Sequence, residues 1–236
     1  MNLILQIFFN PVKTFNELKR ENKFPGMVFV ILLLLTTVNL ILMVPVTSKV
    51  MQISISSMSI PMPEQQLDAM MSMMHKLRYL MVISGVFSVV ISLFLYALLL
   101  YVITVIAKPS ITYVKAFTLI TYSYFIALAG EFVNTGILYI RGLEKITNPY
   151  EIMFTGLNIF TTVEETGSAG IYILLCLINP FQLLFVVLLS IGLKIFANIK
   201  FMKALIICTI VWLITIAFPV GSVIFSEMAM NKAGLM

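Results

Sequence analysis

The sequence has few of the charged side chains that a water-soluble surface needs. Only 11% of its 236 residues are Asp, Glu, Lys or Arg, whereas 61% are hydrophobic and the mean hydropathy is +1.07. Soluble domains typically carry about 25% charged residues. These values exclude a soluble fold and indicate an integral membrane protein, with no length left for a separate soluble catalytic domain.

Residues with catalytic chemistry are also scarce. The single histidine excludes a paired-histidine metalloprotease motif, and the sequence contains neither a Gly-x-Ser-x-Gly nucleophile motif nor a Gly-rich phosphate loop. Only one acid lies well inside an apolar run, whereas an aspartyl intramembrane protease needs two carboxylates. Both cysteines, Cys176 and Cys208, lie within apolar runs, which argues against a disulfide framework. The sequence therefore predicts a protein that is not an enzyme and uses no cofactor.

The chain does contain five apolar runs that are long enough to cross a bilayer. We predict an all-α integral membrane protein, a single domain over residues 1–236 in which five transmembrane helices form a bundle. Amphipathic interfacial helices are expected at the N-terminus and in the external loops. The predicted spans are 27–46, 80–107, 116–140, 171–197 and 204–225, the fourth of them interrupted at Asn179-Pro180.

An amphipathic cytoplasmic segment, residues 1–26, precedes the first span. Asn10-Pro11 is typical of a helix N-cap followed by proline at the first helical position. Beyond it, Val12, Phe15 and Leu18 form an apolar stripe opposite basic residues. Such a helix can lie on the membrane surface with its apolar face down, or pack on the cytoplasmic end of the bundle, and the sequence leaves both alternatives open.

The two longer loops, 47–79 and 141–170, also contain helical patterns. The first loop is expected to be irregular at its start and then helical from Glu64 directly into the second span. In the second loop an Asn-Pro pair at 148–149 resembles a helix start. It predicts a second interfacial helix that continues through Phe160.

Methionines are concentrated in the first of these loops. One face of the helix from Glu64 carries apolar side chains at helical spacing, namely Leu67, Met70, Met71 and Met74. Thioethers can bind Cu(I), but methionine is more often an adaptable apolar contact residue. We predict that these four residues bind a partner protein and that the chain has no metal site.

Basic residues are distributed unequally between the two sides of the predicted bundle. With the N-terminus in the cytoplasm, the cytoplasmic segments carry nine cations and two acids, whereas the longer external segments carry six cations and seven acids. The nine cations are Lys13, Lys19, Arg20, Lys23, Lys108, Lys115, Lys194, Lys200 and Lys203. The positive-inside rule therefore predicts a multi-pass plasma-membrane protein with a cytoplasmic N-terminus and an external C-terminus.

Polar side chains within the spans gather at one depth. Counted inward from the external ends at about 1.5 Å per residue, five of them fall in the outer half of the bilayer. They are Asn39, Glu131, Asn134, Asn179 and Gln182, which we expect to form one polar cluster. Because an ionised carboxylate near mid-bilayer costs about 2.5 kcal/mol or more, Glu131 is a candidate functional residue. The sequence leaves two roles open for it: a proton or ion site, or a hydrogen-bonded carboxyl that holds helices together.

Three stretches of the chain follow a recognisable pattern. They are Phe9-Asn-Pro-Val-Lys-Thr-Phe-Asn-Glu-Leu18, Lys115-Ala-Phe-Thr-Leu-Ile-Thr-Tyr-Ser-Tyr124 and Asn179-Pro-Phe-Gln-Leu-Leu-Phe-Val-Val-Leu-Leu-Ser-Ile-Gly-Leu193. Together with Lys203-Ala-Leu at the start of the last span, they resemble bacterial members of the Yip family, the Ypt/Rab-interacting membrane proteins. The resemblance covers most of the chain, and it implies five spans and a cytosolic N-terminus.

The resemblance also implies a role in binding other proteins. Eukaryotic members of the family act in membrane trafficking, and some bacterial members resemble accessory subunits of peptide-handling ABC exporters in toxin or antimicrobial-peptide resistance. We therefore expect a non-enzymatic adaptor that lies in the lipid bilayer, binds another integral membrane protein such as an ABC exporter, and binds no nucleic acid. The alternative is a small channel or transporter that uses the intramembrane polar cluster around Glu131.

Overall fold

The computed structural model describes residues 2–21, 25–56, 64–109, 111–148 and 152–232, without the side chains of 2, 3, 21, 56, 64–71, 73–76, 78, 227 and 230–232. These ranges contain helices and turns but no strand. The helices are α1 (Asn2–Phe9), α2 (Pro11–Glu21), α3 (Gly26–Ser56), α4 (Glu64–Ile106), α5 (Tyr113–Arg141), η1 (Leu143–Lys145), η2 (Leu157–Phe160), α6 (Val163–Thr166), α7 (Ala169–Leu177), α8 (Pro180–Ala197) and α9 (Phe201–Lys232).

Five of these helices have segments long and apolar enough to cross a membrane. The segments are Gly26–Ile55, Tyr79–Ile106, Tyr113–Arg141, Pro180–Ala197 and Phe201–Ser226. In lipid a helix satisfies its own backbone hydrogen bonds, which is why apolar runs of this length are stable there only as helices or closed barrels. The predicted fold class, a helical integral membrane protein with five spans, is confirmed.

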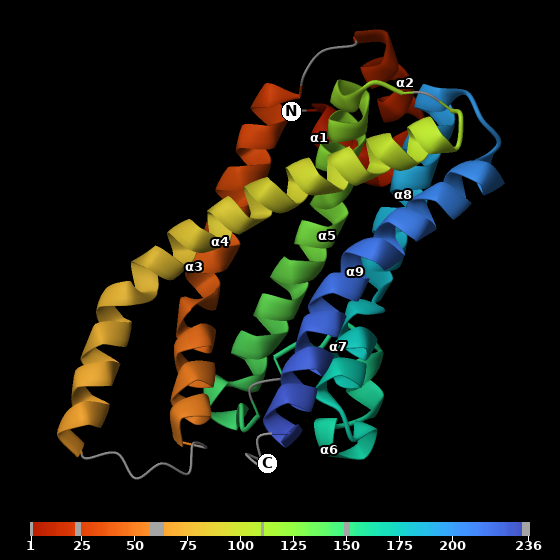
Figure 1. The fold of residues 1–236 in the computed structure, drawn as a ribbon. Coiled ribbons are helices and arrows are strands. Elements are labelled where there is room, and N and C mark those ends of the chain that lie inside the picture. The colour runs from red at the N-terminus through yellow and green to blue at the C-terminus, as the bar shows by residue number, and fades with distance from the viewer. Residues whose placement is uncertain (1, 22–24, 57–63, 110, 149–151, 233–236) are drawn as a thin grey trace.

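The long helices run between two ends of the bundle (Figure 1). Helices α1 and α2 lie at one end, which we call the proximal end, and α6 lies at the other, the distal end. Helices α3, α5 and α9 run from the proximal to the distal end, and α4 and α8 run back. Helix α4 crosses α5 near the proximal end and diverges from α5 and α9 toward the distal end.

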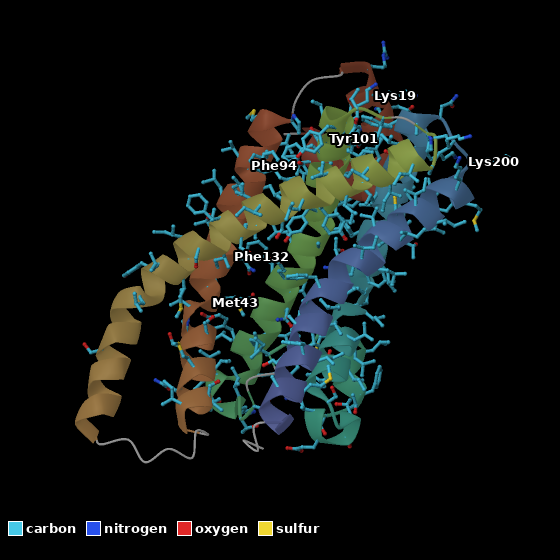
Figure 2. All side chains as sticks on the ribbon, viewed as in Figure 1. Lys19, Met43, Phe94, Tyr101, Phe132 and Lys200 are labelled. Carbon is cyan, nitrogen blue, oxygen red and sulfur yellow. The ribbon has the colours of Figure 1, made fainter. Side chains whose placement is uncertain are left out.

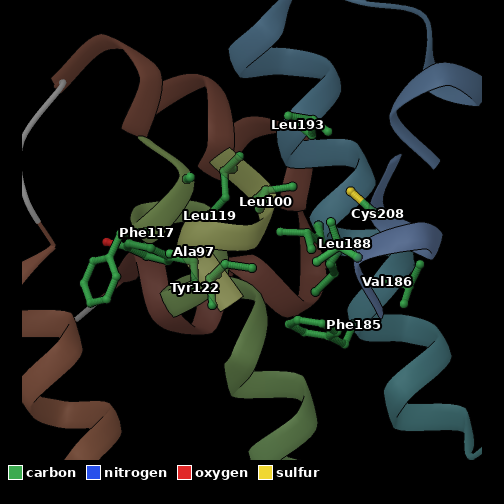
Figure 3. Close-up of a cluster of buried hydrophobic side chains, with 14 of the residues drawn as sticks. Ala97, Leu100, Phe117, Leu119, Tyr122, Phe185, Val186, Leu188, Leu193 and Cys208 are labelled. Atoms are coloured by element: carbon green, nitrogen blue, oxygen red, sulfur yellow. The ribbon is translucent and has the colours of Figure 1, made fainter. Parts of the chain in front are cut away.

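Helix α5 lies at the centre and packs against α3, α4 and α8. Its core side chains, Phe117 and Leu119 among them, meet Leu100 of α4 and Phe185 and Leu188 of α8, all of them buried (Figure 3). Lipid tails are as apolar as these side chains, so burial alone does not hold such helices together. Close packing and interhelical hydrogen bonds do.

Glycines permit the closest helix contacts. A Cβ atom on Gly130 of α5 would lie 2.6 Å from Cγ of Phe181 on α8. A Cβ atom on Gly192 of α8 would lie 2.5 Å from a methyl carbon of Leu119 and 3.0 Å from the ring of Phe15. These two positions bring α8 against α5 and α2 at distances that any side chain would prevent.

The N-terminal segment packs on the bundle. As predicted, Asn10 precedes α2, its Oδ1 accepts from Lys13 N at 3.2 Å, and Pro11 is the first residue of the helix. Phe15 is fully buried and meets the ring of Phe196 edge-on, with centroids 6.5 Å apart. Lys19, labelled in Figure 2, donates from Nζ to the carbonyl of Ile195 at the end of α8 at 2.6 Å. Of the two alternatives for this segment, the structure therefore shows the packed one.

Two helices extend beyond the predicted spans. The prediction of an irregular segment after the first span is wrong for residues 47–56, because α3 continues through Pro45 to Ser56. Val46 is buried against Leu138 of α5 and Ile146, and this contact holds the extension in place. The prediction that a helix from Glu64 continues into the second span is confirmed, since α4 runs unbroken for 43 residues.

The prediction of an interfacial helix in the second long loop is wrong for the residues of that loop that the structure describes. Residues 149–151, which include part of the expected helix start, lie outside the described structure. Residues 152–156 are not helical, and the four residues of η2 form a 3₁₀ turn. The side chain of Asn134 binds the backbone of Ile152 and Phe154 in this segment. Further along, a Cβ on Gly156 would lie 2.4 Å from the carbonyl oxygen of Cys176, so the loop also passes close to the end of α7.

Candidate functional site

A polar link joins α3 to α5 within the membrane-spanning segments. Asn39 of α3 is 5% exposed, and its Nδ2 donates to Oε2 of Glu131 on α5 at 3.4 Å. Glu131 lies ten residues before the end of α5, about 15 Å into the span at 1.5 Å per residue. The carboxyl group is thus well inside the membrane-spanning segment, and a hydrogen bond joins it to Asn39, another member of the expected polar cluster.

Two further side chains on α5 complete this network. The hydroxyl of Thr135 lies 2.9 Å from Oδ1 of Asn39 and 2.9 Å from the carbonyl oxygen of Glu131, so its proton is shared between two acceptors. The hydroxyl of Tyr124 donates to Oε1 of Glu131 at 3.3 Å. Each carboxylate oxygen therefore receives one hydrogen bond, and both bonds are long for their kind.

Glu131 is exposed even though it lies on the buried face of its helix. The side chains one turn away on the same face, Ala127, Leu128, Asn134 and Thr135, are all buried. Glu131 itself is exposed, at the distal half of α5, from which α4 diverges (Figure 1). Glu131 is thus an exposed carboxyl group with buried side chains one turn away on either side.

Asn134 does not join this network. Its Nδ2 donates to the carbonyl of Ile152 at 2.9 Å, and its Oδ1 accepts from the N–H of Phe154 at 2.7 Å. The amide thus forms hydrogen bonds with the backbone of two loop residues, Ile152 and Phe154. Its function is to fix the loop after α5 against the helix.

Asn179 is also separate. It is the N-cap of α8, where its Oδ1 accepts from Gln182 N at 2.9 Å and its Nδ2 contacts the carbonyl of Cys176 at 3.3 Å. Pro180 follows at the first helical position, so the break in the predicted fourth span is a capped junction between α7 and α8. Gln182 is half-buried and contributes its backbone N–H to this cap. The five predicted residues thus form three local arrangements, and the structure joins only Asn39 and Glu131 of them by a side-chain hydrogen bond.

The candidate partner-binding residues Leu67, Met70, Met71 and Met74 belong to the distal part of α4. Their side chains lie outside the part of the chain that the structure describes. The backbone places all four on a helix that extends beyond the span starting at Tyr79, on the distal side.

The sequence-based reasoning missed Thr135. A hydroxyl four residues after Glu131 lies on the same helix face, so the i, i+4 spacing could have predicted that Thr135 lies beside Glu131. Tyr124, seven residues before Glu131, shares that face in the same way.

These features define a helical membrane protein with five spans, a packed N-terminal helix and a polar link between its first and third spans. The chain belongs to the Yip1 domain family, whose pattern matches residues 5–222. This is a family of Rab-interacting membrane proteins associated with trafficking. No curated protein and no solved structure matches the chain.

Proposed function

We propose that this protein is a non-enzymatic adaptor that binds another integral membrane protein within the bilayer. The observation that carries the proposal is the exposed carboxyl of Glu131 in the middle of a transmembrane helix. A membrane accessory role of this general kind also fits the Yip1 domain family.

The carboxyl of Glu131 has unused hydrogen-bonding capacity. A carboxylate offers about four lone-pair positions, and the described donors, Asn39 and Tyr124, occupy two of them with long bonds. No Lys or Arg among the described residues forms an ion pair with it. Because water is scarce at this depth, a donor from a second transmembrane helix would satisfy the group best.

The matching partner is therefore a membrane protein with a Lys, Arg or amide side chain inside one of its own spans. An ion pair between two helices in lipid makes binding specific, because a partner without the matching cation would leave the carboxyl group of Glu131 unpaired. We propose an ABC exporter that handles peptides as the partner, and the plasma membrane as the location. The basic residues at the proximal end support a cytoplasmic N-terminus and an external C-terminus.

The distal extension of α4 supplies a second contact in this proposal. Its backbone carries Leu67, Met70, Met71 and Met74 beyond the span, where methionine side chains suit contact with a variable protein surface. Glu131 would fix the partner in the bilayer, and this face would contact it outside.

Affinity purification from native membranes in a mild detergent tests the proposal. The wild-type chain should recover a multi-span membrane protein, and Glu131→Leu should lose it, while Glu164→Gln, a charge removed from the exposed distal surface, should not. Equal recovery by all three variants would contradict the proposal. Substrate flux in proteoliposomes that contain the purified chain alone and depend on Glu131 would identify a transporter instead.

A further inference from the structure

A second feature, remote from Glu131 along α5, is a cavity of about 300 Å³ at the distal end. Its walls come from the end of α5, from η1 and from the segment between Phe154 and Thr162, with Tyr172 of α7. The cavity adjoins Arg141, where the segment long and apolar enough to span a membrane ends. In a bilayer that this segment spans, the cavity would lie at the level of the lipid headgroups.

Two cations line this cavity. The guanidinium of Arg141 is held over the ring of Phe154, 4.1 Å from its centroid, and Lys145 lies one helical turn further along the chain. Within the described residues neither cation is paired with a carboxylate. An anion in the cavity would thus meet two charges that form no ion pair with any described residue.

Two described acids near the cavity, Glu144 and Glu165, do not line it. Glu165 accepts hydrogen bonds from the hydroxyl of Thr161 and the N–H of Thr162, as part of the cap of α6. Glu144 lies against the backbone of Gly142 and lines a separate groove with Lys49. Among the described residues that line the cavity, Arg141 and Lys145 are therefore the charged ones.

The cavity also contains a buried acceptor without a donor. Asn158 is 2% exposed, and its Nδ2 donates to the carbonyl of Met153 at 2.5 Å and to the hydroxyl of Tyr172 at 3.0 Å. A carbonyl can only accept, which fixes the orientation of the amide. Oδ1 is then left buried with no hydrogen-bond donor among the described groups. Buried acceptors are almost always satisfied, so this atom points to a ligand that carries a donor.

We propose that this cavity binds a phosphate with a nearby hydrogen-bond donor, the chemistry of a phospholipid headgroup such as ethanolamine or glycerol. The phosphate lies between Arg141 and Lys145, and the ammonium or hydroxyl group donates to Oδ1 of Asn158. The adjoining turn η2 exposes Leu157, Ile159 and Phe160, by 45%, 56% and 80%, which provides apolar contact for acyl chains beside the cavity.

Native mass spectrometry of the full chain, delipidated in detergent, tests this site. Phosphatidylethanolamine, phosphatidylglycerol and phosphatidylcholine with identical acyl chains are titrated in parallel. The first two should bind about tenfold more tightly than phosphatidylcholine, whose quaternary ammonium has no N–H for Asn158. Lys145→Gln, an exposed substitution, should weaken phosphatidylethanolamine binding about fivefold, whereas Lys49→Gln at the same end should leave it unchanged.

Soluble phosphoethanolamine identifies the source of the headgroup. Displacement of the lipid at a similar concentration would assign the site to free phosphorylated amines, and retention of the lipid would assign it to the bilayer. Equal binding of all three lipids, or the same effect of Lys145→Gln and Lys49→Gln, would overturn the proposal and indicate non-specific lipid around the helices.

Discussion

Asn39 and Glu131 are 92 positions apart in the sequence, yet their side chains share a hydrogen bond of 3.4 Å between α3 and α5. Thr135 extends the link to the other side of the Asn39 amide at 2.9 Å. Within this network Asn39 and Thr135 are buried, whereas Glu131 is exposed. The same carboxyl therefore links two helices, and in the proposed adaptor role it would also accept a hydrogen bond from a third.

The first prediction separates these two roles by stability. Glu131→Leu removes the acceptors for Asn39 and Tyr124 and should lower the free energy of unfolding by about 0.6–2 kcal/mol per lost bond. Glu131→Gln keeps the shape and one carbonyl acceptor, so it should melt close to wild type. Thermal melting of both variants in detergent measures the difference, and equal melting of the two would show that the hydrogen bonds contribute nothing.

The second prediction concerns the contact between α5 and α8. Gly130→Ala places a Cβ against the ring and Cβ of Phe181 and should destabilise the bundle by about 1–3 kcal/mol. Gly136→Ala is the matched control on the same helix, because its Cβ would meet no atom within 4 Å. Melting curves of the pair should differ. Equal melting temperatures for Gly130→Ala and Gly136→Ala would show that Phe181 does not pack this closely against Gly130.

The third prediction concerns the loop that Asn134 holds. Asn134→Leu removes both contacts to the backbone of Ile152 and Phe154, at about 1–3 kcal/mol in total. The segment should then be cleaved faster by a protease added at the distal side of the purified protein. Val133→Leu, a substitution at the exposed neighbouring position, serves as the control and should leave the cleavage rate unchanged.

The fourth prediction concerns orientation in the membrane. Cysteine at position 164, exposed at the distal end, should react with an impermeant thiol reagent added to intact cells, whereas cysteine at position 200, exposed at the proximal end, should react only after lysis. The native Cys176 and Cys208 are buried and provide a low background. Labelling of position 200 alone in intact cells would show that the protein has the opposite orientation in the membrane.

The sequence predicted the helices well because each span must satisfy its own backbone, which leaves a strong apolar signal. The helix start at Asn10-Pro11 was equally readable from its residue types. Asn179-Pro180 was expected only to interrupt the fourth span, and in the structure it caps α8. The continuation of α3 past Pro45 was not readable, because it depends on the contact of Val46 with Leu138 and Ile146 from a distant part of the chain.

The polar residues show the same limit. Depth along each span follows from counting residues, and this count predicts that Asn39, Glu131, Asn134, Asn179 and Gln182 share one depth. Rotation about each helix axis decides which of them meet. Asn134 turns toward the loop at Ile152, and Asn179 turns along its own chain to cap α8. Neither direction is encoded in the spacing of apolar residues.

The most direct test of the adaptor proposal is a charge exchange with the partner recovered by affinity purification. Glu131→Lys should reduce recovery of that partner about tenfold or more, because two cations then face each other in the bilayer. Replacing the partner's intramembrane Lys or Arg with Glu should restore recovery with Glu131→Lys and abolish it with the wild-type chain. Unchanged recovery with Glu131→Lys, in a protein that still melts as a folded bundle, would contradict a binding role for this carboxyl.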